Sequence, residues 1–297
     1  KKPDKGITVL INGDDPQLAF IGEKIPAQGR NDNKNVLYFG LDDKKLFLSK
    51  MQHATDTIFC PSCGTRLTFT GVYFSHLGDW KCTKCGFTHP KSTITSSTVI
   101  SPLEGVYNSY NALAATLVSE TLGINKSTIE NSLNSFLPAF GRMESVRYEG
   151  KQIKILLSKN PTGFNESLRT VLSSNQKGPM LLLLNDRIPD GTDVSWIWDV
   201  DFELLEDYHY PLIISGDRAL DMGVRIKYGV SSYPTSPELR GASELRVKNE
   251  MKCIREKLKD AVNVAVEKTK ENETLWILAT YSAMLDVRKL LTGKKIL

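Results

Sequence analysis

The chain has 297 residues, of which 40% are hydrophobic and 24% are charged, so it is long enough for two domains with hydrophobic cores. Its formal net charge of +4 is small for this length, and charge alone therefore does not indicate nucleic acid as the main partner. No apolar run is long enough to span a membrane, and Lys1 to Asp4 lack the apolar core of a signal peptide. We expect a soluble, cytoplasmic protein.

The first apolar segment, Ile7 to Asn12, predicts a buried strand. The polar residues Gly13 to Pro16 follow it directly. Ligands bind at the carboxyl ends of strands in open α/β sheets, so this polar loop is a candidate binding site. A second short strand is expected from Asn35 to Phe39, before a different pattern interrupts the sheet.

That pattern consists of two Cys-x-x-Cys-Gly motifs, which hold four of the five cysteines: Cys60, Cys63, Cys82 and Cys85. Their spacing is typical of a four-cysteine zinc site, and the alternating residues between the two pairs predict a short hairpin. We therefore expect a structural zinc ribbon, whose closed site leaves no open position on the metal for catalysis. Disulfides or free core thiols are the alternative. The nearby His76 and His89 are expected on the surface.

Two helices are expected after the ribbon. Small and apolar residues from Ala112 to Val118 predict a helix that begins close to Asn111. The next helix is expected to have Ser127 as its N-cap, with Glu130 in the capping-box position.

Beyond Gly141, apolar runs alternate with helical patterns up to the end of the chain. Buried strands separated by helices indicate a parallel sheet covered on both faces, so this half is predicted to be a doubly wound, Rossmann-like α/β domain. The expected strands are 153–157, 180–184, 211–215 and 275–278, and the expected helices are 164–172, 220–227, 244–270 and 283–291.

Polar groups follow four of these strands. The carboxyl ends of parallel strands meet at one edge of a sheet, so we expect the groups to share one rim. They are Lys159 to Gly163, Asn185 with Asp186, Ser215 to Arg218, and Thr280 to Ser282.

The segment from Asp190 to Glu203 combines Trp196 and Trp198 with several carboxylates. Exposed tryptophans beside charged residues are typical of interface hot spots. A single buried tryptophan with solvated acids around it is the plainer interpretation, and composition alone supports both.

Four motifs, taken in order, resemble the central and C-terminal domains of the Mur ligases, which make cell-wall peptide bonds. They are Asn12–Pro16, Tyr107–Ala115, Gly141–Glu144 and Lys159–Pro161. A cysteine ribbon inserted in the central domain, together with Asp193–Asp199 and Thr280–Leu285, is similar to one branch of that family. The resemblance covers essentially the whole chain. It implies a partial Mur-ligase-like central domain (1–57 and 91–140), a ribbon insertion (58–90) and a C-terminal domain (141–297).

By this resemblance, the chain is an ATP-dependent synthase subunit that uses Mg²⁺ and activates the α-carboxylate of D-glutamate in the lipid II stem peptide. A class I glutamine amidotransferase partner, GatD, would form a heterodimer with it and deliver ammonia from glutamine, giving D-isoglutamine for peptidoglycan. The complex would act on lipid II at the inner face of the membrane, without nucleic acid. The alternative is a zinc-ribbon protein that binds nucleic acid or serves as a scaffold without turnover.

The motifs suggest residues for ATP. Asn111 can pair with the adenine edge, because its amide offers both a donor and an acceptor, and Arg142 can reach a ribose or phosphate oxygen. Lys159 can neutralise charge on a transferring phosphoryl group, and Asn160 would position it. Asn108 and Glu144 fit equally well as loop and cap residues.

The resemblance also implies that a carboxylate of this chain completes the partner's cysteine–histidine pair, since such a histidine works best when a carboxylate orients it. Asp199 is the candidate because it follows the paired tryptophans directly. Asp201 is the rival, since it points the same way if the segment is extended, whereas Asp193 is expected to be a turn or capping residue.

One feature departs from the family pattern. The Gly-x-x-Gly-Lys-Thr phosphate loop is absent from these residues, and the chain opens at what is predicted to be an interior strand. We expect either that the N-terminal part of the central domain is missing from this sequence or that this form does not turn over ATP.

Overall fold

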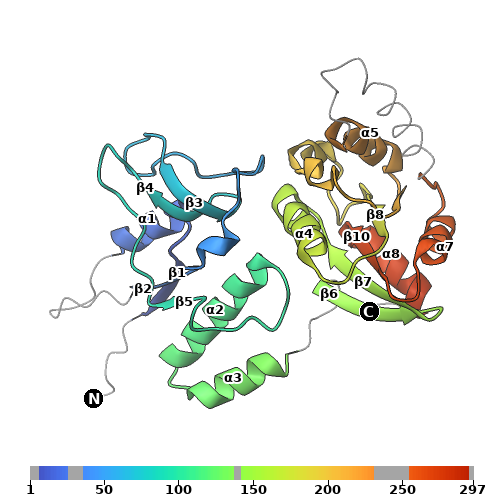
Figure 1. Cartoon of the computed structure of the whole chain (residues 1–297). Coiled ribbons are helices and arrows are strands. Elements are labelled where there is room, and N and C mark those ends of the chain that lie inside the picture. The colour runs from blue at the N-terminus through green and yellow to red at the C-terminus, as the bar shows by residue number, and fades with distance from the viewer. Residues whose placement is uncertain (1–6, 26–35, 137–141, 231–253, 294–297) are drawn as a thin grey trace. The chain divides into compact units, whose positions relative to one another are not determined.

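The computed structural model describes residues 7–25, 36–136, 142–230 and 254–293 (Figure 1). The chain divides into two compact units, Lys1–Leu137 and Pro138–Leu297. None of the helices within the described ranges is long and apolar enough to cross a membrane.

The first unit is built on a three-stranded parallel sheet in the order β1-β2-β5. Its core lies between this sheet and the long helix α2, where Leu113 and Leu117 are almost fully buried against Ile94 and Leu41. The strands are β1 (Val9–Asn12), β2 (Val36–Gly40) and β5 (Ile94–Thr95), and the helices are α1 (Pro16–Lys24), α2 (Val106–Thr121) and α3 (Lys126–Asn134), with a 3-10 turn at Lys44–Leu46.

Three helix starts in this unit differ from expectation. The predicted ligand loop after β1 instead leads into α1, because the Asp15 side chain accepts hydrogen bonds from the N–H groups of Gln17 and Leu18 and caps the helix. Helix α2 begins at Val106, so Asn111 lies inside it rather than at its start. The cap of α3 is Asn125, which accepts from the Thr128 N–H.

The ribbon between β2 and β5 forms an antiparallel hairpin of β3 (Thr68–Phe74) and β4 (Leu77–Lys81). It has a small core of its own, in which Trp80 and Phe87 pack with Ala19 of α1. The ribbon is thereby attached to the sheet through the first helix.

The second unit contains a five-stranded sheet in the order β6-β7-β10-β8-β9. All neighbours are parallel except β6 and β7. The elements are β6 (Arg142–Tyr148), β7 (Lys151–Leu157), β8 (Met180–Leu183), β9 (Leu212–Ser215), β10 (Thr274–Ala279), α4 (Pro161–Ser173), α5 (Ala219–Val230), α7 (Leu258–Lys268) and α8 (Tyr281–Thr292), with 3-10 turns η2 (Ser195–Asp199) and η3 (Phe202–Leu205).

Both faces of this sheet are covered, as the continuous apolar strands predict (Figure 1). Side chains alternate along each strand, so Leu182 and Trp276 join the core under α4 and α5, whereas Leu181 and Ile277 join the core under α7 and α8. The predicted doubly wound α/β fold is confirmed for this unit.

Two details of the second unit were predicted wrongly. Strand β6 was missed because its sequence, Arg-Met-Glu-Ser-Val-Arg-Tyr, has few apolar residues, and it pairs as an antiparallel edge strand. The helix expected at 244–270 begins only at Leu258 within the described residues, since Ile254 instead forms a β-bridge with Ile214 and packs against the core. Residues 244–253 lie outside the described part of the chain.

Candidate metal centre and partner-facing segment

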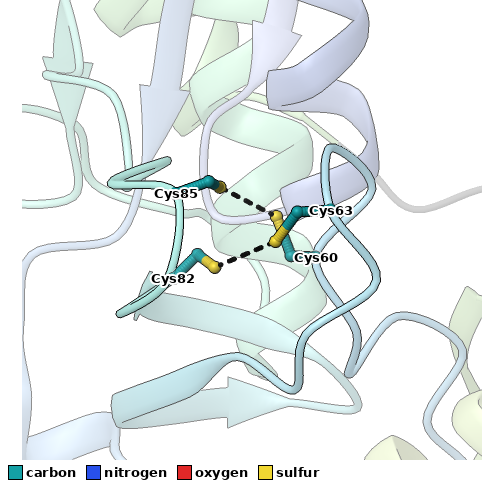
Figure 2. A group of neighbouring side chains, drawn as sticks. All are labelled: Cys60, Cys63, Cys82 and Cys85. Atoms are coloured by element: carbon teal, nitrogen blue, oxygen red, sulfur yellow. Dashed lines mark hydrogen bonds between the residues drawn. The ribbon is translucent and has the colours of Figure 1, made fainter.

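The two cysteine motifs of the ribbon bring their sulfur atoms to one point (Figure 2). The Sγ atoms of Cys60 and Cys85 are 3.6 Å apart, and those of Cys63 and Cys82 are 3.5 Å apart. All four lie within 4.8 Å of one another, and none forms a disulfide. Four thiolates bound tetrahedrally at the usual Zn–S length would be separated by about 3.8 Å, so the arrangement fits a zinc ion.

The two motifs have the same backbone geometry. The Gly64 N–H donates to the Cys60 carbonyl at 2.8 Å, and the Gly86 N–H donates to the Cys82 carbonyl at 3.2 Å. Both glycines have positive φ, +72° and +79°, a conformation that side chains disfavour. Each motif therefore needs its glycine to direct two sulfurs at the same point.

The thiols of the cluster differ in acidity. Burial raises the pKa of the Cys60 thiol to about 12, whereas hydrogen bonds from Thr65 lower the pKa of Cys63 to about 6. A metal ligand must be a thiolate, so a cation bound here would also stabilise the charged form of Cys60.

Asp14, at the end of β1, connects the ribbon to the sheet. Its side chain is fully buried, and its carboxylate contacts His89 Nε2 at 2.8 Å, accepts from the Tyr110 hydroxyl at 2.5 Å and accepts from the Leu41 N–H at 2.8 Å. The loop expected to bind a ligand is therefore occupied by contacts within the protein.

The two ribbon histidines were wrongly expected on the surface. His76 is 9% exposed and its Nε2 lies 3.4 Å from the Asp15 carboxylate, while His89 contacts Asp14. Both carboxylates that follow β1 thus contact a ribbon histidine. Only the fold brings these residues together, because they are separated by more than sixty positions in the sequence.

We expect Asp14→Ala to destabilise the first unit by about 3 kcal/mol, because the buried N–H of Leu41 and the hydroxyl of Tyr110 both lose this charged acceptor. Urea unfolding measures the change. Asp43→Ala is the control, since Asp43 only caps the exposed 3-10 turn at Lys44 and should cost about 1 kcal/mol or less. Equal losses in the two variants would contradict a special role for Asp14.

The polar groups predicted to share a rim in the second unit do lie along one edge of its sheet. Asn185 follows β8 and links the others: its N–H donates to Thr280 Oγ1 at 3.0 Å, its amide donates to Ser282 Oγ at 3.0 Å, and its Oδ1 accepts from the Asp217 N–H at 2.9 Å. Ser158, at the end of β7, donates its N–H to the last residue of β10. This prediction is confirmed.

The residues proposed for ATP divide between the two units. Asn111 is exposed on α2, and its amide donates to Asn108 Oδ1 at 3.4 Å. In the second unit, Lys159 is exposed between β7 and α4, and Asn160 caps α4 by accepting from the Gly163 N–H at 2.7 Å. Arg142 begins β6, and its side chain lies outside the described part of the structure.

The three candidate aspartates of the tryptophan segment have different surroundings. Asp199, the last residue of η2, is exposed. Asp201 is buried and forms a reciprocal pair with Asn165, whose amide donates to Asp201 Oδ2 at 2.9 Å. Asp193 accepts from the Ser195 N–H at 2.8 Å, a bond that holds the pKa of its carboxyl below the ordinary value. Asp199 is thus exposed, in contrast to Asp201, and it does not cap a neighbouring N–H group as Asp193 does.

An apolar surface adjoins Asp199. Trp198 is 51% exposed and lies beside Tyr228, which is 57% exposed, with 6.4 Å between ring centroids. Leu220, Val224 and Tyr228 recur every four residues on α5 and all are exposed, so they form one stripe on that helix. A contiguous patch of this kind is typical of a protein–protein interface.

Sequence reasoning did not identify Arg225 or Asn165, which contact the tryptophan segment from α5 and α4. The sequence carries a weak signal for them: an arginine and an asparagine stand inside otherwise amphipathic helices, on positions that face inward. Their partners lie 22 to 36 residues away, so no local pattern reveals the contacts.

Comparisons with known proteins agree with this architecture. The family described as MurT ligase C-terminal matches residues 157–284. The MurT subunit of lipid II isoglutaminyl synthase (glutamine-hydrolyzing) from Staphylococcus aureus is 31% identical over 249 residues, covering 78% of this chain and 54% of that protein. The subunit of the same name from Streptococcus pneumoniae is also 31% identical, covering 97% of this chain and 63% of that protein.

Among solved structures, a pseudomurein peptide ligase type C from Methanothermus fervidus is similar, with a TM-score of 0.60 and 20% identity over 96% of this chain and 56% of that one. The fold is therefore that of the Mur-ligase-like peptide ligases. Residues 157–284 match the MurT ligase C-terminal family, and the chain is similar to the two MurT subunits over most of its length. It spans about half to two-thirds of the length of the two curated relatives.

Proposed function

We propose that this chain is the ATP-dependent subunit of a complex that amidates lipid II, activating the α-carboxylate of D-glutamate in the stem peptide. The observation that carries the proposal is the match of residues 157–284 to the MurT ligase C-terminal family, a range that includes the exposed Asp199 beside an apolar surface. Ammonia comes from glutamine through a class I glutamine amidotransferase of the GatD type. Lipid II is a membrane-linked substrate, so the complex acts at the inner face of the membrane.

Asn111 and Arg142 bind the nucleotide in this proposal, and Lys159 neutralises developing charge on the phosphoryl group. Both Asn111 and Lys159 are exposed, which supports contact with a ligand. Asn160 acts indirectly, because its side chain caps α4 and thereby fixes the turn that carries Lys159. ATP with Mg²⁺ supplies the energy of activation, and the Gly-x-x-Gly-Lys-Thr phosphate loop is not among the residues of this sequence.

The proposed zinc is structural. Four cysteines complete a tetrahedral site, and His89 of the ribbon contacts Asp14, which also accepts from Tyr110 of α2. We accordingly propose a central domain formed by 1–57 and 91–140, a ribbon insertion at 58–90 and a C-terminal domain at 141–297.

The test is reconstitution of the complete protein with a class I glutamine amidotransferase from the same cell. We expect a stable complex that converts the D-glutamate carboxyl of lipid II to the amide when ATP and glutamine are both present. Mass spectrometry of the stem peptide measures conversion, and omission of ATP is the control. Tight, salt-dependent binding to DNA or RNA without complex formation would instead favour a nucleic-acid-binding ribbon protein.

A further inference from the structure

A single buried arginine holds the backbone on both sides of Asp199. Arg225 lies on α5 and is 3% exposed. Its Nε donates to the carbonyl of Ile197 at 3.2 Å, and its Nη2 donates to the carbonyl of Val200 at 2.5 Å. These two carbonyls flank Trp198 and Asp199, so one planar group spans the turn that carries the candidate carboxylate.

Further contacts fix the guanidinium group. The Glu203 carboxylate accepts from Nη2 at 2.9 Å, and the Arg225 Cζ lies 5.6 Å from the Trp198 ring centroid and 5.4 Å from that of Phe202. One turn along α5, Gly229 leaves room for the group, since a Cβ there would overlap Nη1. Lysine carries a point charge and no planar fork, so it cannot make these contacts together.

A second side chain holds the segment just beyond Asp199. Asn165 on α4 accepts from the Asp201 N–H at 2.7 Å and donates to the Asp201 carboxylate at 2.9 Å. The backbone is thus held at positions 197, 200 and 201, while Asp199 itself stays exposed. Because Arg225 and Asn165 both bind the backbone of this short turn, they restrict the direction in which the Asp199 carboxylate points.

We propose that Arg225 is a positioning residue for Asp199, setting the direction in which that carboxylate is presented to the histidine of the glutaminase partner. The inference rests on the proposed function, in which Asp199 serves the partner's active site. Small errors in the placement of such a group have large effects, because a displacement of about 1 Å caused by a distant mutation can cost up to about 10²-fold in rate.

The test uses the complete protein in complex with its glutaminase partner. We expect Arg225→Lys to leave complex formation intact and to lower the kcat of glutamine hydrolysis by about 10- to 100-fold with little change in KM. On an Asp199→Asn background the same substitution should have almost no further effect, because the group it positions is gone. A merely structural role would lower activity by the same factor on both backgrounds.

Gly229→Ala supplies a second variant that displaces the guanidinium group without removing it, and it should give the same dependence on Asp199. Arg187→Lys is the control, since it makes the same exchange at an arginine that pairs with the carboxylates of Asp217 and Asp286. Wild-type kcat in both the Arg225→Lys and the Gly229→Ala complexes would overturn the positioning role of Arg225. It would leave the role of Asp199 standing. Unchanged hydrolysis by the Asp199→Asn complex would overturn the role of Asp199 itself, and the inference with it.

Discussion

Replacing Cys60 with serine is expected to release the zinc and unfold the ribbon from residue 58 to 90. Metal binding in small zinc domains contributes on the order of 10 kcal/mol, far more than the few buried side chains around Trp80 can supply. Cys60 is the most informative ligand because it is 2% exposed, so a hydroxyl there cannot be replaced at the metal by solvent. Elemental analysis and limited proteolysis of the ribbon measure the loss.

Loss of zinc should also destabilise the sheet of the first unit. His89 follows the last cysteine motif, and with the ribbon unfolded it can no longer contact Asp14. The hydrogen bond from the Gly78 N–H to the Asp14 carbonyl, 3.0 Å long, is lost at the same time. We therefore expect destabilisation of the first unit and an unchanged second unit.

Cys253→Ser is the control for this experiment, because the fifth cysteine lies outside the two motifs. It should retain one equivalent of zinc. Less than about half an equivalent in the unmodified protein purified without chelator would contradict the zinc assignment, given the one closed site expected.

Asp199→Asn is expected to preserve the complex while lowering glutamine hydrolysis by the partner by ~10²-fold or more, since an amide cannot stabilise the charged histidine as a carboxylate does. The structure separates Asp199 from its rivals: Asp201 is buried against Asn165, and Asp193 caps the Ser195 N–H. Steady-state assays of glutamate release by the purified complex give the rate.

Asp201→Asn and Asp193→Asn are the matched comparisons. Asp201→Asn should mainly reduce stability, because its amide would face the Asn165 amide at a site shaped for a carboxylate. Asp193→Asn should have little effect on either property. Loss of glutaminase activity in Asp201→Asn alone, without loss of folding, would move the assignment by two residues.

Much of the fold follows from local sequence. The paired Cys-x-x-Cys-Gly motifs specify both their turns and their ligands, because each glycine adopts a positive φ directly after the second cysteine. The apolar run from Met180 to Leu183 is typical of a strand covered on both faces, and it forms β8. The rim of polar groups follows in turn, since parallel strands place their carboxyl ends on one edge.

The errors arose where the sequence carries a competing local signal. Asp14, Asp15 and Pro16 resemble a polar loop, yet Asp15 caps a helix and Asp14 is an internal acceptor. Strand β6 is polar because it lies at the edge of its sheet and is paired on one side only. Residues 254–257 belong to a charged run of helical composition, yet Ile254 pairs with Ile214 and the helix begins at Leu258.

By itself, the sequence predicted the four-cysteine cluster and the parallel α/β sheet, because each depends on spacing or periodicity within a short stretch. Only the tertiary structure decided that Asp201 is buried while Asp199 is exposed, and which residues hold the backbone around Asp199. Arg225 and Asn165 reach the segment from separate helices, and Tyr110 reaches Asp14 across 96 positions. Such contacts depend on how helices pack against a sheet, a property that no local pattern encodes.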